Sequence, residues 1–359
     1  MKRIVLIFVF LSAMIVSTAA QLRNDDVWTT DLDRSYVRDV IRIPDIPGYL
    51  TLKCDFHIHT VFSDGKVWPD VRVNEAWMQG LDAIAITDHI EVRPNRRLLQ
   101  GDFNESFKIA KRRADQVGFI VIKASEITRN KPFGHFNALF LTDSNPLEVK
   151  DSMEAIDIAR QQGAVIMWNH PGWPDNKSTV YDVHKKMIAE KKIDLVEVHN
   201  HMEYYPLTFD WIDTYDLAPI ATSDTHDAIL IEYGNEKMSR PMTLVFARER
   251  TESGIKEALL ARRTAAFFDN TVVAKKEWAE KLFWASICYR VISIEKTTAL
   301  VEIENISDIP YIIRTGTNAR TIIPAGKTVR TKFTPPGIIT VENVFIGHNK
   351  RLEVPIPVE

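Results

Sequence analysis

The strongest constraint on the fold is an alternation of short apolar or β-branched runs with amphipathic stretches, from residue 51 to about residue 270. Seven of these runs predict strands, at 51–56, 82–87, 119–124, 164–168, 194–198, 219–222 and 242–247. Strands that alternate with helices indicate βαβ units and a parallel sheet. Seven units favour a barrel related to the (β/α)8 type with one unit missing or distorted, and an open doubly wound sheet is the alternative.

Two of the intervening stretches carry clear helix signals. Apolar residues recur at spacings of three and four over 103–117, and Gly118 follows them. The stretch 146–162 begins with Pro146 and is followed by Gly163, which matches the usual punctuation of helix ends. We therefore expect a helix in each stretch.

The character of the sequence changes after Val272. Short strand-like runs separated by turn residues follow, and helical periodicity is absent. These runs lie at 290–295, 299–305, 311–314, 328–334 and 338–345. The chain of 359 residues also exceeds the roughly 250–300 residues at which a single core usually stops growing. We expect 51–271 to form the barrel, 272–359 a small all-β, sandwich-like domain, and 21–50 an N-terminal arm.

The N-terminus has the pattern of a secretory signal. Lys2 and Arg3 precede an apolar run over 4–16, and small residues follow up to Ala20. A membrane anchor is the alternative, but the run is shorter than the roughly 18 apolar residues that spanning requires. We expect residues 1–20 to be cleaved, with no membrane span afterwards, and the protein to be exported, to the periplasm in a Gram-negative bacterium.

The net charge argues against nucleic-acid partners, and the cysteine content argues against a disulfide-stabilised fold. Forty-five Lys and Arg against 48 Asp and Glu give a formal net charge of −3. No global positive field exists to hold a polyanion, so stable nucleic-acid binding is not expected. Cys54 and Cys288, the two cysteines, lie far apart in the sequence and do not form a disulfide framework.

The histidines cluster in the sequence. Nine of the ten lie between 57 and 226, and most directly follow a predicted strand, as do several Asp and Glu residues. The carboxyl ends of barrel strands converge on one face, so these side chains would meet there. A single histidine of this kind is more often a cap or a satisfied polar residue than a ligand. At least six strand ends carry such groups, however, and imidazoles with carboxylates suit Zn, Mn or Fe, so the sequence predicts a metal centre.

Several motifs stand at these strand ends. They are His57-x-His59, Ser63-Asp64-Gly65, Asp88-His89, Glu126, His135, His170-Pro171-Gly172 and Asp224-x-His226. In order and spacing they resemble the polymerase-and-histidinol-phosphatase (PHP) phosphoesterase superfamily, over residues 51 to 270. The stretch 54–69 is most similar to exported bacterial PHP-type phosphodiesterases. The resemblance implies a distorted (β/α)7 TIM-like barrel that holds two to three divalent ions.

The resemblance also implies a ligand set for each ion. One ion would be bound by His57, His59, Glu126 and Asp224, a second by Glu126, His135 and His170, and a third by Asp64, His89 and His226. Some relatives have a histidine where this chain has Asp64, so the third site departs from the family pattern. Asp88 is expected to hold a ligand imidazole in its tautomer from outside the ligand set.

Two further histidines, His199 and His201, have no counterpart in that set. One of them could replace His170 as a ligand, contact substrate or protonate a leaving group, and the last two roles are the ones expected of His199. A structural role for His199 is the alternative.

Cations and aromatic residues in the predicted strand-end loops are candidates for binding the substrate. Lys66, Arg93 and Arg129 could bind its non-transferred part, although such charges are more often simply solvated. Trp68 and Trp173 could line a pocket, and packing is the alternative.

The resemblance implies a hydrolase for a small-molecule phosphoester. Two ions that share a bridging hydroxide would supply the nucleophile. Our interpretation is an exported metal-dependent phosphoesterase that acts on phosphodiesters. One alternative is a phosphomonoesterase for a small metabolite or nucleotide, as in the histidinol-phosphatase-like branch. The other is a non-catalytic metal-binding module whose β domain binds a partner or a glycan.

Overall fold

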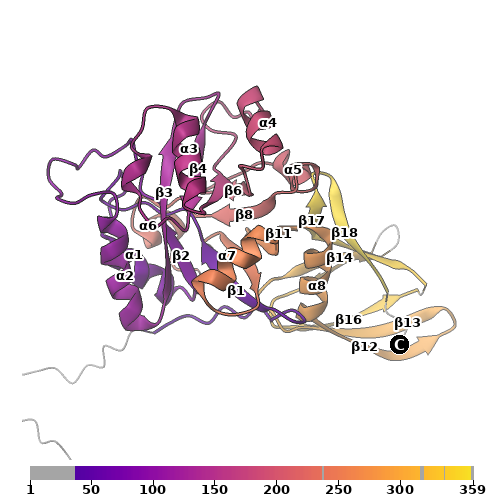
Figure 1. Cartoon of the computed structure of the whole chain (residues 1–359). Coiled ribbons are helices and arrows are strands. Elements are labelled where there is room, and N and C mark those ends of the chain that lie inside the picture. The colour runs from indigo at the N-terminus through magenta and orange to yellow at the C-terminus, as the bar shows by residue number, and fades with distance from the viewer. Residues whose placement is uncertain (1–36, 237, 316–318, 335, 357–359) are drawn as a thin grey trace, which may run out of the picture. The chain divides into compact units, whose positions relative to one another are not determined.

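All seven strands predicted between 51 and 270 are present in the computed structural model (Figure 1). They are β1 (Leu50–Asp55), β2 (Ala83–Ile86), β3 (Ile120–Thr128), β5 (Val165–Trp168), β6 (Leu195–Asn200), β8 (Ala218–Thr222) and β9 (Met242–Ala247). The structure describes residues 37–236, 238–315, 319–334 and 336–356, and from Val37 onward the chain forms one compact unit. The predicted signal at 1–20 and the arm up to residue 36 lie outside the described residues.

The sheet is mixed, with mostly parallel strands. β1, β2 and β3 are parallel, and so are β5, β6 and β8. β4 (His135–Leu139) lies antiparallel between β3 and β5, and β9 lies antiparallel to β1. Along the described chain no backbone ladder joins β8 to β9. Instead, Thr243 Oγ1 accepts from Ala221 N (3.1 Å) and donates to Ala221 O (2.9 Å). Closure of the sheet into a barrel stays a prediction.

Helices alternate with these strands. They are α1 (Pro69–Met78), α2 (Glu105–Val117), α3 (Ser152–Gln161), α4 (Asp182–Ala189), α5 (Thr208–Thr214), α6 (Ile229–Tyr233) and α7 (Glu252–Leu260). The prediction for α2 is confirmed, and Gly118 ends it with a φ of 64°. The helix predicted over 146–162 is shorter than expected. Asp151 has an extended backbone and caps α3 by accepting from Glu154 N, so only a 3-10 turn (Asn145–Leu147) precedes it.

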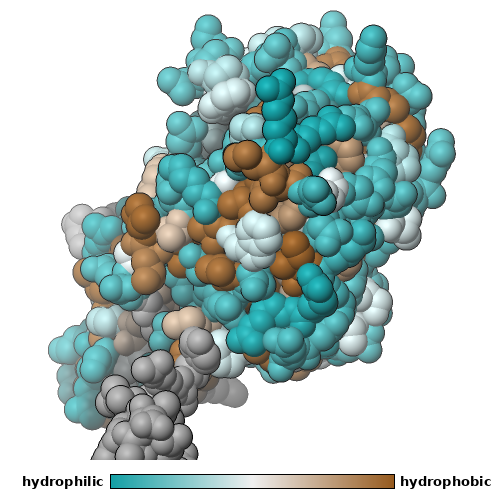
Figure 2. Space-filling model, turned by 90° about the vertical axis from the view of Figure 1, so that its left-hand side faces the viewer, coloured by the Kyte–Doolittle hydropathy of each residue, from teal (hydrophilic) through white to brown (hydrophobic). Residues whose placement is uncertain are grey.

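α1 and α2 lie on one side of the molecule, and the C-terminal strands lie on the opposite side (Figure 1). Figure 2 looks onto the side with α1 and α2, where hydrophilic side chains cover most of the surface and hydrophobic ones gather near the middle. Among the described residues, no helix is long and apolar enough to span a membrane.

The main sheet continues beyond residue 271. β10 (Thr264–Phe268) pairs with β9, β11 (Thr271–Ala274) pairs with β10, and β17 (Ile338–Gly347) runs parallel to β11. The strands β14 (Tyr311–Thr315), β15 (Ala319–Ile323) and β18 (Lys350–Pro355) complete this edge. A separate antiparallel sheet holds β12 (Ile287–Glu295), β13 (Thr298–Asn305) and β16 (Thr328–Phe333). The C-terminal part is therefore rich in β-structure, as predicted.

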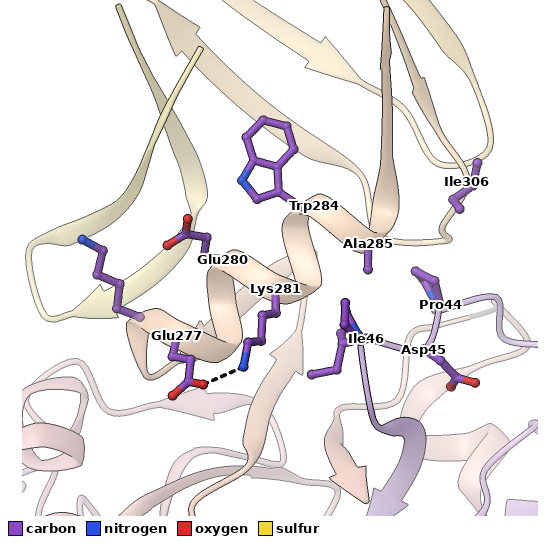
Figure 3. A pocket seen from close by; sticks show the side chains of 11 residues that line it. Pro44, Asp45, Ile46, Glu277, Glu280, Lys281, Trp284, Ala285 and Ile306 are labelled. Carbon is purple, nitrogen blue, oxygen red and sulfur yellow. Dashed lines mark hydrogen bonds and ion pairs between the residues drawn. The ribbon is translucent and has the colours of Figure 1, made fainter. Parts of the chain in front are cut away.

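The expected absence of helix after Val272 is wrong, because α8 spans Lys276–Ser286. Trp278, Ala279, Leu282 and Phe283 repeat at helical spacing and are all buried. A cavity of about 960 Å³ lies between α8 and residues 44–47 (Figure 3). None of its described lining residues is a histidine, and it shares no lining residue with the cavity at the candidate site.

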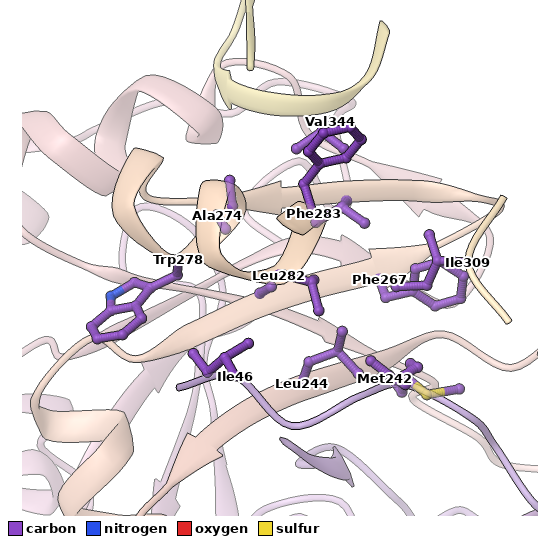
Figure 4. Close-up of a cluster of buried hydrophobic side chains, with 14 of the residues drawn as sticks. Ile46, Met242, Leu244, Phe267, Ala274, Trp278, Leu282, Phe283, Ile309 and Val344 are labelled. Carbon is purple, nitrogen blue, oxygen red and sulfur yellow. The ribbon is translucent and has the colours of Figure 1, made fainter. Parts of the chain in front are cut away.

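α8 joins both parts of the chain in one buried cluster (Figure 4). Met242 and Leu244 from β9 share this cluster with Val344 from β17 and with Ile309, which lies between β13 and β14. The two predicted domains thus share a hydrophobic core.

Candidate metal centre

The structure brings all nine predicted metal ligands together at one end of the sheet. They lie at or just beyond the ends of β1, β2, β3, β5 and β8, or at the start of β4, and are His57, His59, Asp64, His89, Glu126, His135, His170, Asp224 and His226. Three groups have ligand atoms within 4.8 Å of one another: His57, His59 and Asp224; His57, Glu126 and His170; and His59, Asp64, His89 and His226. His135 lies outside these groups, but its Nδ1 is 2.9 Å from Glu126 Oε1.

Glu126 lies at the centre of the cluster and is fully buried. Its Oε2 is 3.2 Å from His57 Nε2 and 3.3 Å from His59 Nε2. Its Oε1 faces His135 and lies 3.5 Å from His170 Nε2. Oε2 also lies 3.1 Å from His89 Nδ1. The His57 and His59 pair and the His135 and His170 pair thus face different carboxylate oxygens, which is the arrangement that a carboxylate bridging two ions requires.

Two other carboxylates face imidazole nitrogens. Asp224 Oδ1 is 3.2 Å from His57 Nε2 and 3.0 Å from His59 Nε2. Asp64 Oδ1 is 3.5 Å from His89 Nε2 and 3.3 Å from His226 Nε2. Both of these oxygens are buried without a well-formed hydrogen bond. Burying a carboxylate oxygen without a partner raises the free energy of the folded protein, and a bound cation would remove that penalty. The potential ligand atoms of the cluster are imidazole nitrogens and carboxylate oxygens, so divalent cations fit it.

In two of the candidate ligands, Nδ1 contacts a protein oxygen on the side away from the centre of the cluster. His57 Nδ1 lies 2.8 Å from Glu197 Oε1, and His226 Nδ1 lies 2.8 Å from the carbonyl oxygen of Asp224. With Nδ1 as the donor in each contact, Nε2 carries the lone pair toward the centre, as metal ligation by histidine requires.

Asp88 does not contact an imidazole, which corrects the sequence prediction. Its carboxylate accepts from Thr60 N, Thr60 Oγ1 and Ser63 Oγ, each at 2.7 Å. Ser63 Oγ in turn lies 3.3 Å from His59 Nδ1. Asp88 therefore acts on His59 through Ser63.

Glu197 is a residue to which the sequence analysis assigned no role. It is fully buried and accepts from Thr222 Oγ1 (2.6 Å), Asn200 Nδ2 (3.0 Å) and His170 N (2.5 Å), besides facing His57. It thus links two candidate ligands. A carboxylate near the end of a predicted apolar strand, two residues before His199, was the sequence feature that could have identified it.

A buried ion pair supports the backbone at Asp224, which has a left-handed φ of 49°. Asp55 accepts from Ser223 N (3.2 Å) and Ser223 Oγ (2.5 Å). Both Arg240 Nε (3.0 Å) and a terminal nitrogen (2.7 Å) donate to Asp55. Asp224 N also donates to His57 O at 2.9 Å. These contacts hold a candidate ligand in an unfavourable conformation.

Burial and close opposite charges shift the pKa values of the cluster. Burial alone would lower the pKa of His57, but Asp224, Glu126 and Glu197 raise it well above its usual value. Burial would raise the pKa of Glu126, but His89, His57 and other imidazoles hold it well below its usual value. The carboxylates are therefore ionised, and a cation competes with protons for the imidazoles.

A cavity of about 630 Å³ opens onto this cluster. Beyond the metal candidates, Trp173, His201, Met202 and Tyr205 contribute to its wall. Trp173 lines it as expected, whereas Trp68 does not.

The three predicted substrate cations do not line this cavity. Lys66 pairs with Asp227 at 2.6 Å, Arg93 donates to the carbonyl oxygen of Phe62, and Arg129 pairs with Glu91. Their charges are engaged elsewhere, so the predicted contacts with substrate are not supported. The prediction rested on their position in strand-end loops, and that position does not determine where a long side chain points.

His199 and His201 point in different directions. His199 is buried with its ring centroid 4.2 Å from that of Phe268, and burial together with nearby His201 lowers its pKa to about 3. It does not line the cavity, so its position corrects the predicted substrate role. His201 does line the cavity, and its Nδ1 lies 3.3 Å from the Tyr233 hydroxyl.

Comparison with known proteins identifies the family. No protein-family model matches the chain. An uncharacterized protein from Methanocaldococcus jannaschii is 26% identical over 190 residues, which cover 51% of this chain and 68% of the relative. A crystal structure from Bacteroides vulgatus, of a two-domain protein containing a predicted PHP-like metal-dependent phosphoesterase, is 36% identical, with a TM-score of 0.85. The match covers 90% of this chain and 99% of that one. The chain therefore belongs to the PHP-like metal-dependent phosphoesterases.

Proposed function

We propose that this protein hydrolyses small-molecule phosphodiesters with two to three divalent ions, of Zn, Mn or Fe. His57, His59, Glu126 and Asp224 would hold one ion, Glu126, His135 and His170 a second, and Asp64, His89 and His226 a third. Ions in such sites activate water at neutral pH and offset charge on phosphoryl oxygens. The distorted barrel is part of the same proposal.

The protein's own groups fix the ligands in place. Glu126 presents one oxygen to each of two histidine pairs. Glu197 and Ser63 orient the imidazoles of His57 and His59, and the Asp55–Arg240 pair holds the Asp224 backbone through Ser223. Because these groups are buried and hydrogen-bonded, little reorganisation accompanies binding.

The charge of the cavity wall is the observation that carries the preference for diesters. Five carboxylates line the cavity, those of Asp64, Glu126, Glu203, Asp224 and Glu232, and no Lys or Arg does so among the described residues. A monoester dianion carries one more negative charge than a diester. Asp64, Glu126 and Asp224 are proposed ligands, so bound ions would offset their charge. Glu203 and Glu232 are not ligands, and with no Lys or Arg beside them in the described lining they disfavour the additional charge of a monoester. Trp173, Met202 and Tyr205 offer apolar surface to the second substituent of a diester.

A specific observation favours the monoesterase alternative as well. The group of His59, Asp64, His89 and His226 provides donors for a third ion, which would offset the extra charge of a dianion. The balance between these two effects decides the preferred substrate.

The test is a comparison of paired aryl mono- and diesters on purified protein loaded separately with Zn, Mn and Fe(II). We expect a higher kcat/KM for the diester with at least one metal. Turnover of the monoester alone would favour the alternative phosphatase. Bound metal without turnover of either ester would favour the non-catalytic module.

We also propose that the protein is exported, on the basis of the N-terminal sequence pattern. Fractionation of cells that express the full chain should place a chain beginning at Gln21 outside the cytoplasm. A full-length chain that stays in the cytoplasm would contradict export without affecting the proposed chemistry.

A further inference from the structure

A second groove opens beside the metal cavity. It has a volume of about 590 Å³ and lies between the loop at 172–179, which follows β5, and the segment at 202–207, which contains β7 (Glu203–Tyr204). Met202, Glu203 and Tyr205 line both the groove and the metal cavity. The groove therefore adjoins the cavity where the phosphodiester would react, and these three residues form the boundary between the two spaces.

The groove offers apolar and aromatic surface with little net charge. Met202, Tyr204 and Leu207 are 60%, 59% and 50% exposed. Lys177 and Glu203 are the two charged residues in its described lining, and their charges are opposite. A second phosphate would meet no excess of positive charge here, whereas an uncharged group would meet apolar surface.

The aromatic wall is held in place from behind. The Tyr204 ring stacks on Phe268, with centroids 6.0 Å apart and an interplanar angle of 27°. His199 also stacks on Phe268, which gives this buried histidine a supporting role. A ring that is already fixed loses little conformational entropy when a ligand stacks on it.

Tyr205 separates the groove from the metal cavity, and a glycine permits its position. A Cβ atom at Gly172 would lie 2.7 Å from Tyr205 Cε1, so a side chain there would displace the ring. The Tyr205 hydroxyl donates to Glu203 Oε2 at 3.1 Å. The boundary between the two spaces is thus built by the loops that follow β5 and β6.

We propose that this groove binds a flat, uncharged ring carried by the second ester group of the substrate, stacked on Tyr204. The inference rests on the proposed phosphodiesterase function and specifies its substrate class. Stacking of a flat ring on an exposed aromatic side chain is energetically favourable and tolerates varied ring chemistry.

Three diesters that share a 4-nitrophenyl leaving group test this proposal on the metal-loaded full chain. Their second substituents are methyl, cyclohexyl and phenyl. We expect kcat/KM for the phenyl ester to exceed that for the methyl ester by about tenfold, with the cyclohexyl ester between them. In Tyr204→Ala and Leu207→Ala the ratio of phenyl to methyl should fall toward one.

Matched controls replace exposed side chains outside both spaces. Leu98→Ala, at a residue that is 83% exposed, and Trp68→Ala should keep the wild-type ratio. Equal rates for all three diesters, a cyclohexyl ester as fast as the phenyl ester, or an unchanged ratio in Tyr204→Ala would each overturn the groove assignment. Absence of turnover with every diester would instead contradict the proposed phosphodiesterase function.

Discussion

The strand ends of the main sheet and the part of the chain after residue 271 have different roles. The strand ends carry the candidate metal ligands, whereas the later part supplies buried apolar residues. Every candidate ligand lies between residues 57 and 226. The C-terminal part has a single histidine, His348, whose backbone N–H donates to Asp210 Oδ1 at 3.0 Å. Yet α8 and the C-terminal strands fill the same hydrophobic cluster as β9 and β10.

The candidate chemistry thus lies in one region of the protein, and much of the burial that stabilises its fold involves the other. Ligands at strand ends act over a few ångströms, whereas burial of apolar surface stabilises the whole unit at once. Changes in the two regions should therefore give different signatures, metal loss in one and lower stability in the other.

The largest effect is expected at Glu126. Glu126→Ala removes the carboxylate that faces both histidine pairs, so the protein should lose two bound ions and about 10³-fold or more in kcat/KM. Metal analysis of the purified variant measures the first effect and ester hydrolysis the second. The exposed Glu154→Ala should keep full metal content and activity. Full metal occupancy in Glu126→Ala would contradict the bridging assignment.

A change in the C-terminal region should alter stability instead. Phe283 is 2% exposed and lies in the shared cluster, so Phe283→Ala should lower the free energy of unfolding by about 3–5 kcal/mol, as measured in urea. The control Ile294→Ala, at a residue that is 64% exposed, should change it by about 0.5 kcal/mol or less. If folded Phe283→Ala lost its metal, the separation of the two regions would be wrong.

The sequence was most informative where local pattern and function coincide. Apolar runs located the strands, and polar residues just after them located the ligands, because the ends of parallel strands meet. β4 was missed although the alternation of His135, Phe136, Asn137 and Ala138 is typical of a strand. α8 was missed although its buried residues repeat at helical spacing, because strand-like runs follow it along the rest of the chain.

Contacts between residues distant in the sequence could not be predicted in this way. Glu197 and His57 are 140 positions apart, and Arg240 and Asp55 are 185 apart. Such pairs form only when the sheet assembles. Long cationic side chains such as Arg93 present the same difficulty, since their direction depends on neighbours that the local sequence does not specify.

Glu197 provides a smaller test within the metal region. Glu197→Ala removes the acceptor for His57 Nδ1 without removing a ligand, and metal affinity should fall by about 10–100-fold. Glu197→Gln keeps an acceptor oxygen and should lose less. Competition with a fluorescent chelator measures both, with the exposed Glu190→Ala as the matched control. Equal affinity in wild type and Glu197→Ala would show that the His57 tautomer needs no carboxylate.

The smallest effect, and the most selective, is expected at Asp64. Its Oδ1 faces His89 and His226, and Asp64 shares no ligand group with His135 or His170, so Asp64→Ala should empty one ion site and leave the others filled. A third ion matters most for a substrate with an additional negative charge. We therefore expect kcat/KM to fall by about tenfold for an aryl monoester and by about twofold for the matched diester. Asp182→Ala, at a side chain that is 97% exposed, should affect neither. Equal losses on both esters for Asp64→Ala would mean that the ions act as one cooperative cluster, in which no single site sets the preference for substrate charge.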